Sequence, residues 1–204
     1  QLHGTHCIFF NNQAMRGGSV YSQNEKAVVN VSLSHFMSNR AMVTGGALYL
    51  VYGTHYFTDT EIQNNEALYR GGGIYIYGKT NSASTMYMSR VALKNNKQLN
   101  PEGSSTAWGG GLYAVFRVNV IVKECLFTRN YAVGNRGHQI MTYSGTDNGT
   151  PSITLINTKF IQETNTSNFY GYDDTTQIAG IEQFIPPATC TPTLCTSNGY
   201  TNPI

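Results

Sequence analysis

The side chains that could perform chemistry in this 204-residue chain are few, and their spacing does not form a catalytic pattern. Hydrolysis of a glycosidic bond needs two carboxyl groups about 5–10 Å apart. The four aspartates stand at positions 59, 147, 173 and 174, and only Asp173 and Asp174 are adjacent. The histidines share no spacing that would assemble a metal site, and no CxxC pair is present; they are His3, His6, His35, His55 and His138. We therefore expect no catalytic residue, no metal and no other cofactor.

The four cysteines divide into two pairs. Cys190 and Cys195 lie close together near the end of the chain. We expect them to form a small disulfide loop, which is typical of an oxidising compartment. Cys7 and Cys125 occupy the same position in the first and fifth copies of the repeat described next. Four steps of about 4.8 Å would separate them by roughly 19 Å, far beyond disulfide range, so we expect two unpaired, buried thiols.

A five-residue glycine box recurs along the chain. The copy Gly45-Gly46-Ala47-Leu48-Tyr49 has two glycines, a small residue, an aliphatic residue and a tyrosine. Three other copies begin at Gly17, Gly71 and Gly109, and a degraded copy begins at Gly137. Gln177-Ile178-Ala179 is interpreted as the remnant of a sixth. An internal repeat of this kind indicates a solenoid or a related repeat architecture.

A second motif precedes each glycine box: an apolar residue, two variable residues and usually an asparagine. The apolar members are Phe9, Phe36, Ile62, Leu93, Phe127 and Phe160, and the asparagines are Asn12, Asn39, Asn65, Asn96 and Asn130. A short alternating apolar run, such as Val29/Val31 or His55/Phe57, lies five positions upstream and is typical of a strand. One unit is therefore predicted to be a strand, a tight corner at the Asn, a glycine turn and a second strand.

Each unit has too few apolar residues to bury a core alone, so we expect successive units to stack in parallel. Stacking aligns Leu48 between Val20 and Ile74, and it places the five motif asparagines in a structural ladder at a corner. Asn suits this corner because it tolerates left-handed backbone and its amide can bond the amide of the next coil. The repeat covers residues 1–180. Residues 181–204 hold four of the chain's six prolines and are expected to cap the last coil or to reach a neighbouring subunit.

The stretch from Cys7 to Gly18, echoed at 36–47, 62–74 and 125–140, resembles the polymorphic outer-membrane-protein repeat of chlamydial adhesins. More loosely, it is similar to the right-handed parallel β-helix superfamily that includes pectate lyases. The resemblance implies an all-β chain forming one right-handed parallel β-helix of about six coils, used for surface display, adhesion or a fibre. Hydrolases of that superfamily use several aspartates, a Gly-His-Gly and an Arg-x-Lys, whereas this chain has no Arg-x-Lys.

Outward-facing side chains are the remaining candidates for binding. Parity along the second strand places Leu48 inside and Tyr49 outside, so we expect an outward aromatic ladder formed by Tyr21, Tyr49, Tyr75, Tyr77 and Tyr113. This ladder either stabilises the sheet by cross-strand stacking or contacts sugars or another protein. Arg16, Arg70 and Arg136, each directly before a glycine box, would face solvent or an anionic glycan. Three N-glycosylation sequons begin at Asn30, Asn148 and Asn165, all expected to be reachable.

Composition and charge exclude several classes of partner. Charged residues are 12% of the chain and the net charge is +2, which argues against nucleic acid. No apolar run approaches the roughly 18 residues that span a bilayer. The chain opens without a charged and apolar leader, which indicates a mature or trimmed product.

A parallel solenoid exposes unpaired backbone groups at its ends, and no capping segment precedes Phe9. We therefore predict an extracellular, cell-surface structural or adhesive protein that assembles head to tail into a filament, with residues 181–204 reaching the next copy. One alternative is a carbohydrate-binding or polysaccharide-cleaving β-helix, the only enzymatic reading. Another is an excised piece of a longer adhesin.

Overall fold

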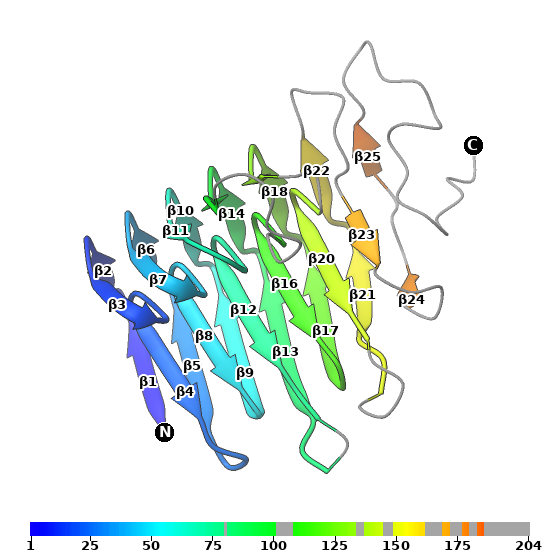
Figure 1. The fold of residues 1–204 in the computed structure, drawn as a ribbon, viewed down its shortest axis with the longest axis horizontal. Coiled ribbons are helices and arrows are strands. Elements are labelled where there is room, and N and C mark those ends of the chain that lie inside the picture. Colours follow the sequence, from blue (N-terminus) through cyan, green and yellow to red (C-terminus); the bar gives the residue numbers. More distant parts are fainter. Residues whose placement is uncertain are drawn as a thin grey trace.

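The protein is an all-β solenoid. The computed structural model describes residues 1–79, 81–100, 108–133, 137–144 and 149–161, and the backbone of three later strands at 169–171, 177–179 and 183–185. The described residues contain strands and turns and no helix. Like strands of successive coils pair in parallel, so that the coils stack along one axis (Figure 1). The predicted parallel β-helix is therefore confirmed.

Each coil contributes one strand to each of several sheets, which we name A to D in chain order. Sheet A contains β1 (Leu2–Thr5), β5 (Val28–Ser32), β9 (Gly53–Thr58), β13 (Ser84–Ser89), β17 (Val118–Lys123), β21 (Ser152–Ile156) and β24 (Gln177–Ala179). Sheet B contains β2 (Ile8–Phe10), β6 (His35–Met37), β10 (Glu61–Gln63), β14 (Ala92–Lys94), β18 (Leu126–Thr128), β22 (Lys159–Ile161) and β25 (Gln183–Ile185).

The other two sheets complete the coil. Sheet C contains β3 (Gln13–Arg16), β7 (Arg40–Thr44), β11 (Glu66–Ala67), β15 (Lys97–Gln98) and β19 (Tyr131–Ala132). Sheet D contains β4 (Val20–Gln23), β8 (Leu48–Val51), β12 (Ile74–Tyr77), β16 (Leu112–Val115), β20 (Ile140–Tyr143) and β23 (Phe169–Gly171). The predicted unit of two strands was therefore wrong. The apolar motif and the segment before the glycine box are strands of two to five residues, too short to show a period in sequence.

The later coils depart from the sequence interpretation in one further way. Gln177–Ala179 is not the remnant of a glycine box, because β24 pairs with β21 in sheet A. β25 pairs with β22 and places Phe184 in register with Phe160, so the solenoid continues past the boundary expected at residue 180. Residues 186–204, with Cys190 and Cys195, lie outside the described residues.

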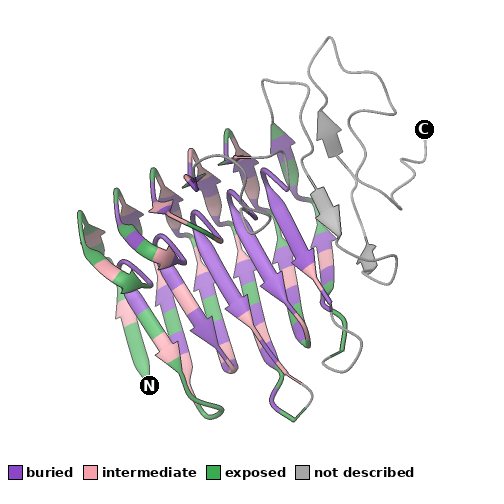
Figure 2. Cartoon of the chain, in the orientation of Figure 1, coloured by how far each residue is buried: buried purple, intermediate pink, exposed green. Residues whose placement is uncertain are grey.

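The core consists of vertical columns of like residues. Val20, Leu48, Ile74, Leu112 and Ile140 are successive partners in sheet D, as predicted. The apolar motif residues form the column of sheet B, in which Phe9 stacks on Phe36 with ring centroids 4.4 Å apart. Burial is complete in the middle coils and partial in the first, as the colours of Figure 2 show. Each coil therefore owes its buried surface to its neighbours.

The corners between sheets use left-handed backbone at fixed positions. Between sheets B and C the residue with positive φ directly precedes the ladder asparagine, at Asn11, Ser38, Asn64, Asn95 and Arg129. We had expected the ladder asparagine itself to adopt this conformation, which was wrong. Between sheets C and D the left-handed residue is the first glycine of the box, such as Gly45 with φ of 68°. A Cβ on the next residue, Gly46, would overlap the carbonyl oxygen of Gly72 in the following coil.

The predicted asparagine ladder is present, and its hydrogen bonds connect every pair of neighbouring coils it spans. Asn65 Oδ1 accepts from the Asn39 backbone N–H and from Asn39 Nδ2, both at 2.9 Å. Asn65 Nδ2 donates to the Phe36 carbonyl at 3.0 Å and to Asn96 Oδ1 at 2.9 Å. Asn12, Asn39, Asn96 and Asn130 continue the pattern in both directions. The ladder asparagines from Asn39 to Asn130 are fully buried. Without these hydrogen bonds, their amide groups would be buried polar groups with no partner, which would destabilise the fold.

The ladder ends at the degraded glycine box. Asn130 Nδ2 donates to Gln139 Oε1, at the point where the sequence of the next coil has Glu163 instead of an asparagine. The neighbouring His138 accepts a hydrogen bond at Nδ1 from the Ala132 backbone N–H, at 3.0 Å. β19 is the last strand of sheet C among the described residues. His138 and Gln139 therefore replace two glycine-box residues, and their side chains bond the last described strand of sheet C and the last asparagine of the ladder.

We expect Asn65→Asp to destabilise the fold by about 3–5 kcal/mol at pH 7, because it buries a carboxylate against the oxygens of Phe36 and Asn96. Stability should recover partly as the pH falls and the carboxyl group becomes a donor. Urea unfolding at several pH values measures both effects. Asn12→Asp, at the exposed end of the same ladder, is the matched control and should cost about 1 kcal/mol. Equal losses for the two variants would contradict the role assigned to the ladder.

Candidate functional site

Groups of three or more metal-binding side chains do not occur among the described residues. No three His, Cys, Asp or Glu side chains there come close enough to hold a metal ion. Asp59 lies on the surface, where Arg90 donates to both of its carboxylate oxygens at 2.6 and 2.8 Å and holds its pKa below the usual range. Asp147, Asp173 and Asp174 lie outside the described residues. The part of the chain that the structure describes includes no helix long and apolar enough to cross a membrane.

The tyrosine ladder exists on the outer face of sheet D, and its rings stack. Tyr21 and Tyr49 have ring centroids 5.1 Å apart, and Tyr49 and Tyr75 are 5.0 Å apart, with interplanar angles of 7° and 4°. Tyr113 is tilted against Tyr75 at 5.6 Å. Tyr77 belongs to the next outward column and meets Tyr52 edge-on. The outward direction was therefore predicted correctly for all five tyrosines.

The expectation that this ladder is exposed was wrong for two of its members. Tyr75 and Tyr113 are 7% and 1% exposed, because they form a second apolar cluster with Trp108, Val115 and Met141 outside sheet D. Burial raises the pKa of both phenols. Only Tyr21 is more than half exposed, at 51%. This face therefore serves mainly as a second core, as cross-strand stacking predicts.

The arginines before the glycine boxes also belong to this cluster. The Arg16 guanidinium lies 5.6 Å from the centre of the Tyr49 ring, and that of Arg70 lies 5.1 Å from the centre of the Trp108 ring. Both contacts are cation–π interactions. The two side chains are thus engaged by aromatic rings, and Arg136 lies outside the described residues. The geometry gives no support to a row of arginines facing an anionic glycan.

A pair of exposed tyrosines on sheet A was missed by the sequence analysis. Tyr56 and Tyr87 are register partners with ring centroids 5.1 Å apart, an interplanar angle of 6°, and exposures of 39% and 41%. Each lies between two inward residues, as Tyr87 lies between Met86 and Met88. The alternation that identified the strands thus contained this signal. Asn30 is the register partner of Tyr56 on the other side and is exposed, as expected for a reachable sequon.

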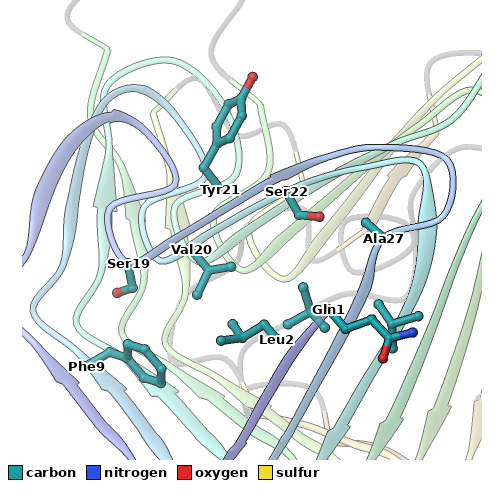
Figure 3. A pocket seen from close by; sticks show the side chains of 10 residues that line it. Gln1, Leu2, Phe9, Ser19, Val20, Tyr21, Ser22 and Ala27 are labelled. Carbon is teal, nitrogen blue, oxygen red and sulfur yellow. The ribbon is translucent and has the colours of Figure 1, made fainter.

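The N-terminal face of the solenoid, formed by β1 to β4, is open. These four strands are the first in their sheets, so their outer backbone groups have no strand to pair with in the described structure. A hollow opens between them, lined by Leu2, Phe9 and Val20. Figure 3 shows these side chains pointing into the hollow while Tyr21 points away from it. The hollow lies directly above the first residues of the core columns, where the core residues of another coil would be placed.

The rim of this face carries three well-exposed apolar side chains beside its polar ones. Ile8, Phe10 and Met15 are 68%, 60% and 66% exposed. The first 23 residues contain no lysine, no proline and no acidic residue, although lysine and proline are the side chains that commonly blunt a free edge. The pairing of β3 with β7 contains one register shift, between Ala14 and Arg16. Such an edge is a template for further pairing.

Two histidines lie buried inside the solenoid. His55 Nε2 lies 2.8 Å from the Tyr52 carbonyl oxygen, and burial lowers its pKa. Burial lowers the pKa of His138 to about 4, while its ring stacks on Tyr131. His3, His6 and His35 are exposed. The five histidines therefore do not converge, in agreement with their spacing in the sequence.

The remaining predicted residues are the cysteines and the sequon asparagines. Cys125 is buried and Cys7, in the open first coil, is half-buried; both are unpaired, as predicted. Burial raises the pKa of the Cys125 thiol to about 11, so it is not a reactive cysteine. The sequon residues Asn148 and Asn165 lie outside the described residues.

Comparison with known proteins finds no matching family model, no matching curated protein and no matching solved structure. The fold and the geometry of its faces therefore carry the functional argument.

We expect the stability of the protein to fall as the pH drops from about 6.5 to 4. The folded pKa of His138, about 4, lies below the value of about 6.5 for an unfolded chain. The unfolded state thus binds the proton more readily, and stabilisation of up to about 3 kcal/mol, complete above pH 6.5, is lost on acidification. Thermal unfolding across this range measures the loss, and His138→Gln should reduce it. His3→Gln, at another exposed position, is the control and should show the same loss as the parent protein; identical profiles for all three proteins would contradict this assignment.

Proposed function

We propose that the protein is an extracellular structural or adhesive β-solenoid that assembles end to end into a filament. The open N-terminal face is the observation that supports this proposal. One more parallel coil would fit on this face. It would pair with the four edge strands, fill the hollow and cover the apolar side chains of the rim. A parallel coil of another copy would pair the free backbone groups and cover Phe9 and Leu2.

The last described strands have the matching registers. β24 carries Ile178 in the column of sheet A that begins with Leu2, and β25 carries Phe184 in the column of sheet B that begins with Phe9. End-to-end stacking would therefore place an apolar register position of one copy over an apolar residue of the next. A contact of this kind joins different surfaces of two identical copies, so it propagates into a fibre instead of closing.

The N-terminal face also supports self-assembly through its charge. Arg16 is the one lysine or arginine among the first 25 residues, and the first acidic residue is Glu25. Little charge would be desolvated when this face is covered, so the cost of burying it is low. The exposed apolar side chains of Ile8, Phe10 and Met15 would lose solvent contact at the rim.

We expect Phe10→Lys to weaken self-association by about tenfold or more, because a lysine at the rim would have to be desolvated and opposes edge pairing. Gln63→Lys is the matched control, because Gln63 lies in the same outward column two coils further on and away from the open face. Sedimentation velocity over a range of concentrations and negative-stain images of both variants measure the effect. A monomer at every concentration, or equal association of the two variants, would overturn the proposal.

A further inference from the structure

The outer face of sheet A offers a site that the assembly of the filament does not use. On β5, β9 and β13 the outward positions form three rows of uncharged side chains. One outer row is Val28, Thr54 and Thr85, the other is Ser32, Thr58 and Ser89, and the middle row is Asn30, Tyr56 and Tyr87. The face thus carries hydroxyl groups and aromatic rings, with the Arg90–Asp59 ion pair at its edge beside Ser89. Hydroxyl groups and aromatic rings together suit a neutral sugar.

The two tyrosines of the middle row form a stack with one free end. Their rings are 5.1 Å apart and nearly parallel, so the planes stand across the solenoid axis. One face of the Tyr56 ring lies against Tyr87, and the other is directed along the row toward Asn30. Register partners in neighbouring parallel strands are about 4.8 Å apart, which is close to the spacing of the stacked rings. A ring carried by Asn30 would occupy the next place in the stack.

Asn30 has the chemistry to carry such a ring. It begins the sequon Asn30-Val31-Ser32, and its exposed side chain points away from the core between the buried Val29 and Val31. In N-glycosylation the Nδ2 atom forms a bond to C1 of a sugar, and the bond from C1 to a lipid diphosphate carrier breaks. The diphosphate leaves with the electron pair, and the proton lost from Nδ2 passes to solvent. No oxidant or reductant is required.

We propose that Asn30 is an N-glycosylation site, and that the first sugar of its glycan, an N-acetylhexosamine, packs on the free face of Tyr56. The apolar C–H face of a pyranose is complementary to an aromatic ring, and hydroxyl groups of Ser32, Thr54 and Thr58 border the place it would take. The sugar therefore continues the stack formed by Tyr87 and Tyr56. This inference rests on the extracellular location in the proposed function, because the modifying enzymes act on secreted chains.

The sugar also stabilises the fold in this arrangement. It covers one face of an aromatic ring that solvent otherwise reaches, and it links β5 to β9 on the side of the sheet away from the core. A stabilisation of this origin depends on the Tyr56 ring. A glycan that projects into solvent would change the stability by the same amount with or without that ring. This dependence separates a packed sugar from an attached one.

The test compares the full chain secreted from a eukaryotic cell with the same chain made in bacteria that lack N-glycosylation. Peptide mass mapping should find a glycan on Asn30. The glycosylated form should unfold about 2–4 °C higher than the unmodified form. Tyr56→Thr should abolish this difference, and Tyr87→Thr, which leaves the face of Tyr56 toward Asn30 in place, should retain most of it.

Each outcome is decisive. An unmodified Asn30 in secreted protein overturns the site, whether or not Asn148 or Asn165 is occupied. A glycan on Asn30 with the same temperature shift in Tyr56→Thr overturns the packing on the ring. Filament formation is followed on both forms by sedimentation, because Asn30 is the register partner of His3 in β1 and lies one coil from the N-terminal face. A monomer in both the glycosylated and the unmodified form would contradict the filament alone, and a filament of secreted protein with unmodified Asn30 would contradict this inference alone.

Discussion

The structure depends on the buried corner amide that holds two coils in register. Each amide from Asn39 to Asn96 is bonded to the coil before and the coil after, through an oxygen that accepts two hydrogen bonds and a nitrogen that donates two. Parallel pairing alone would tolerate a slip of the coils, whereas a buried amide shifted by one residue would lose all of its partners. The vertical alignment of the apolar columns follows from this restriction.

The glycine boxes meet a second constraint of the same kind. A Cβ at Gly46, Gly72 or Gly110 would overlap the carbonyl oxygen of the glycine box residue one coil further on. Glycine is therefore required only where another coil of the same shape follows. The fifth box has His138 and Gln139 instead, and their side chains bond Ala132 and Asn130. What the sequence shows as decay is, in the structure, a pair of side chains that bond the last described strand of sheet C and the last asparagine of the ladder.

The stacking of the coils could be predicted from the sequence because it depends on spacing alone. The apolar columns, the asparagine ladder and the outward direction of Tyr49 all follow from a repeat and a period of two. The four strands of the coil could not be predicted, since β11 and β15 have two residues each. The left-handed position was misplaced by one because Asn64 and Asn65 are the same residue type. The burial of Tyr113 depends on Trp108, which occupies the position before the glycine box that Arg70 has in the previous coil. A change of residue type at a repeated position leaves the spacing unaltered, so the spacing did not reveal it.

The separation of internal coils from terminal features has an evolutionary consequence. A complete turn of the chain between Asn39 and Asn96 presents to its neighbours the same surface on both sides. Duplication or deletion of such a turn would preserve the pattern of corner hydrogen bonds and would keep His138 and Gln139 in place after Asn130. The length of this protein can therefore change by whole turns through simple genetic recombination, while the chemistry of its two ends is inherited unchanged.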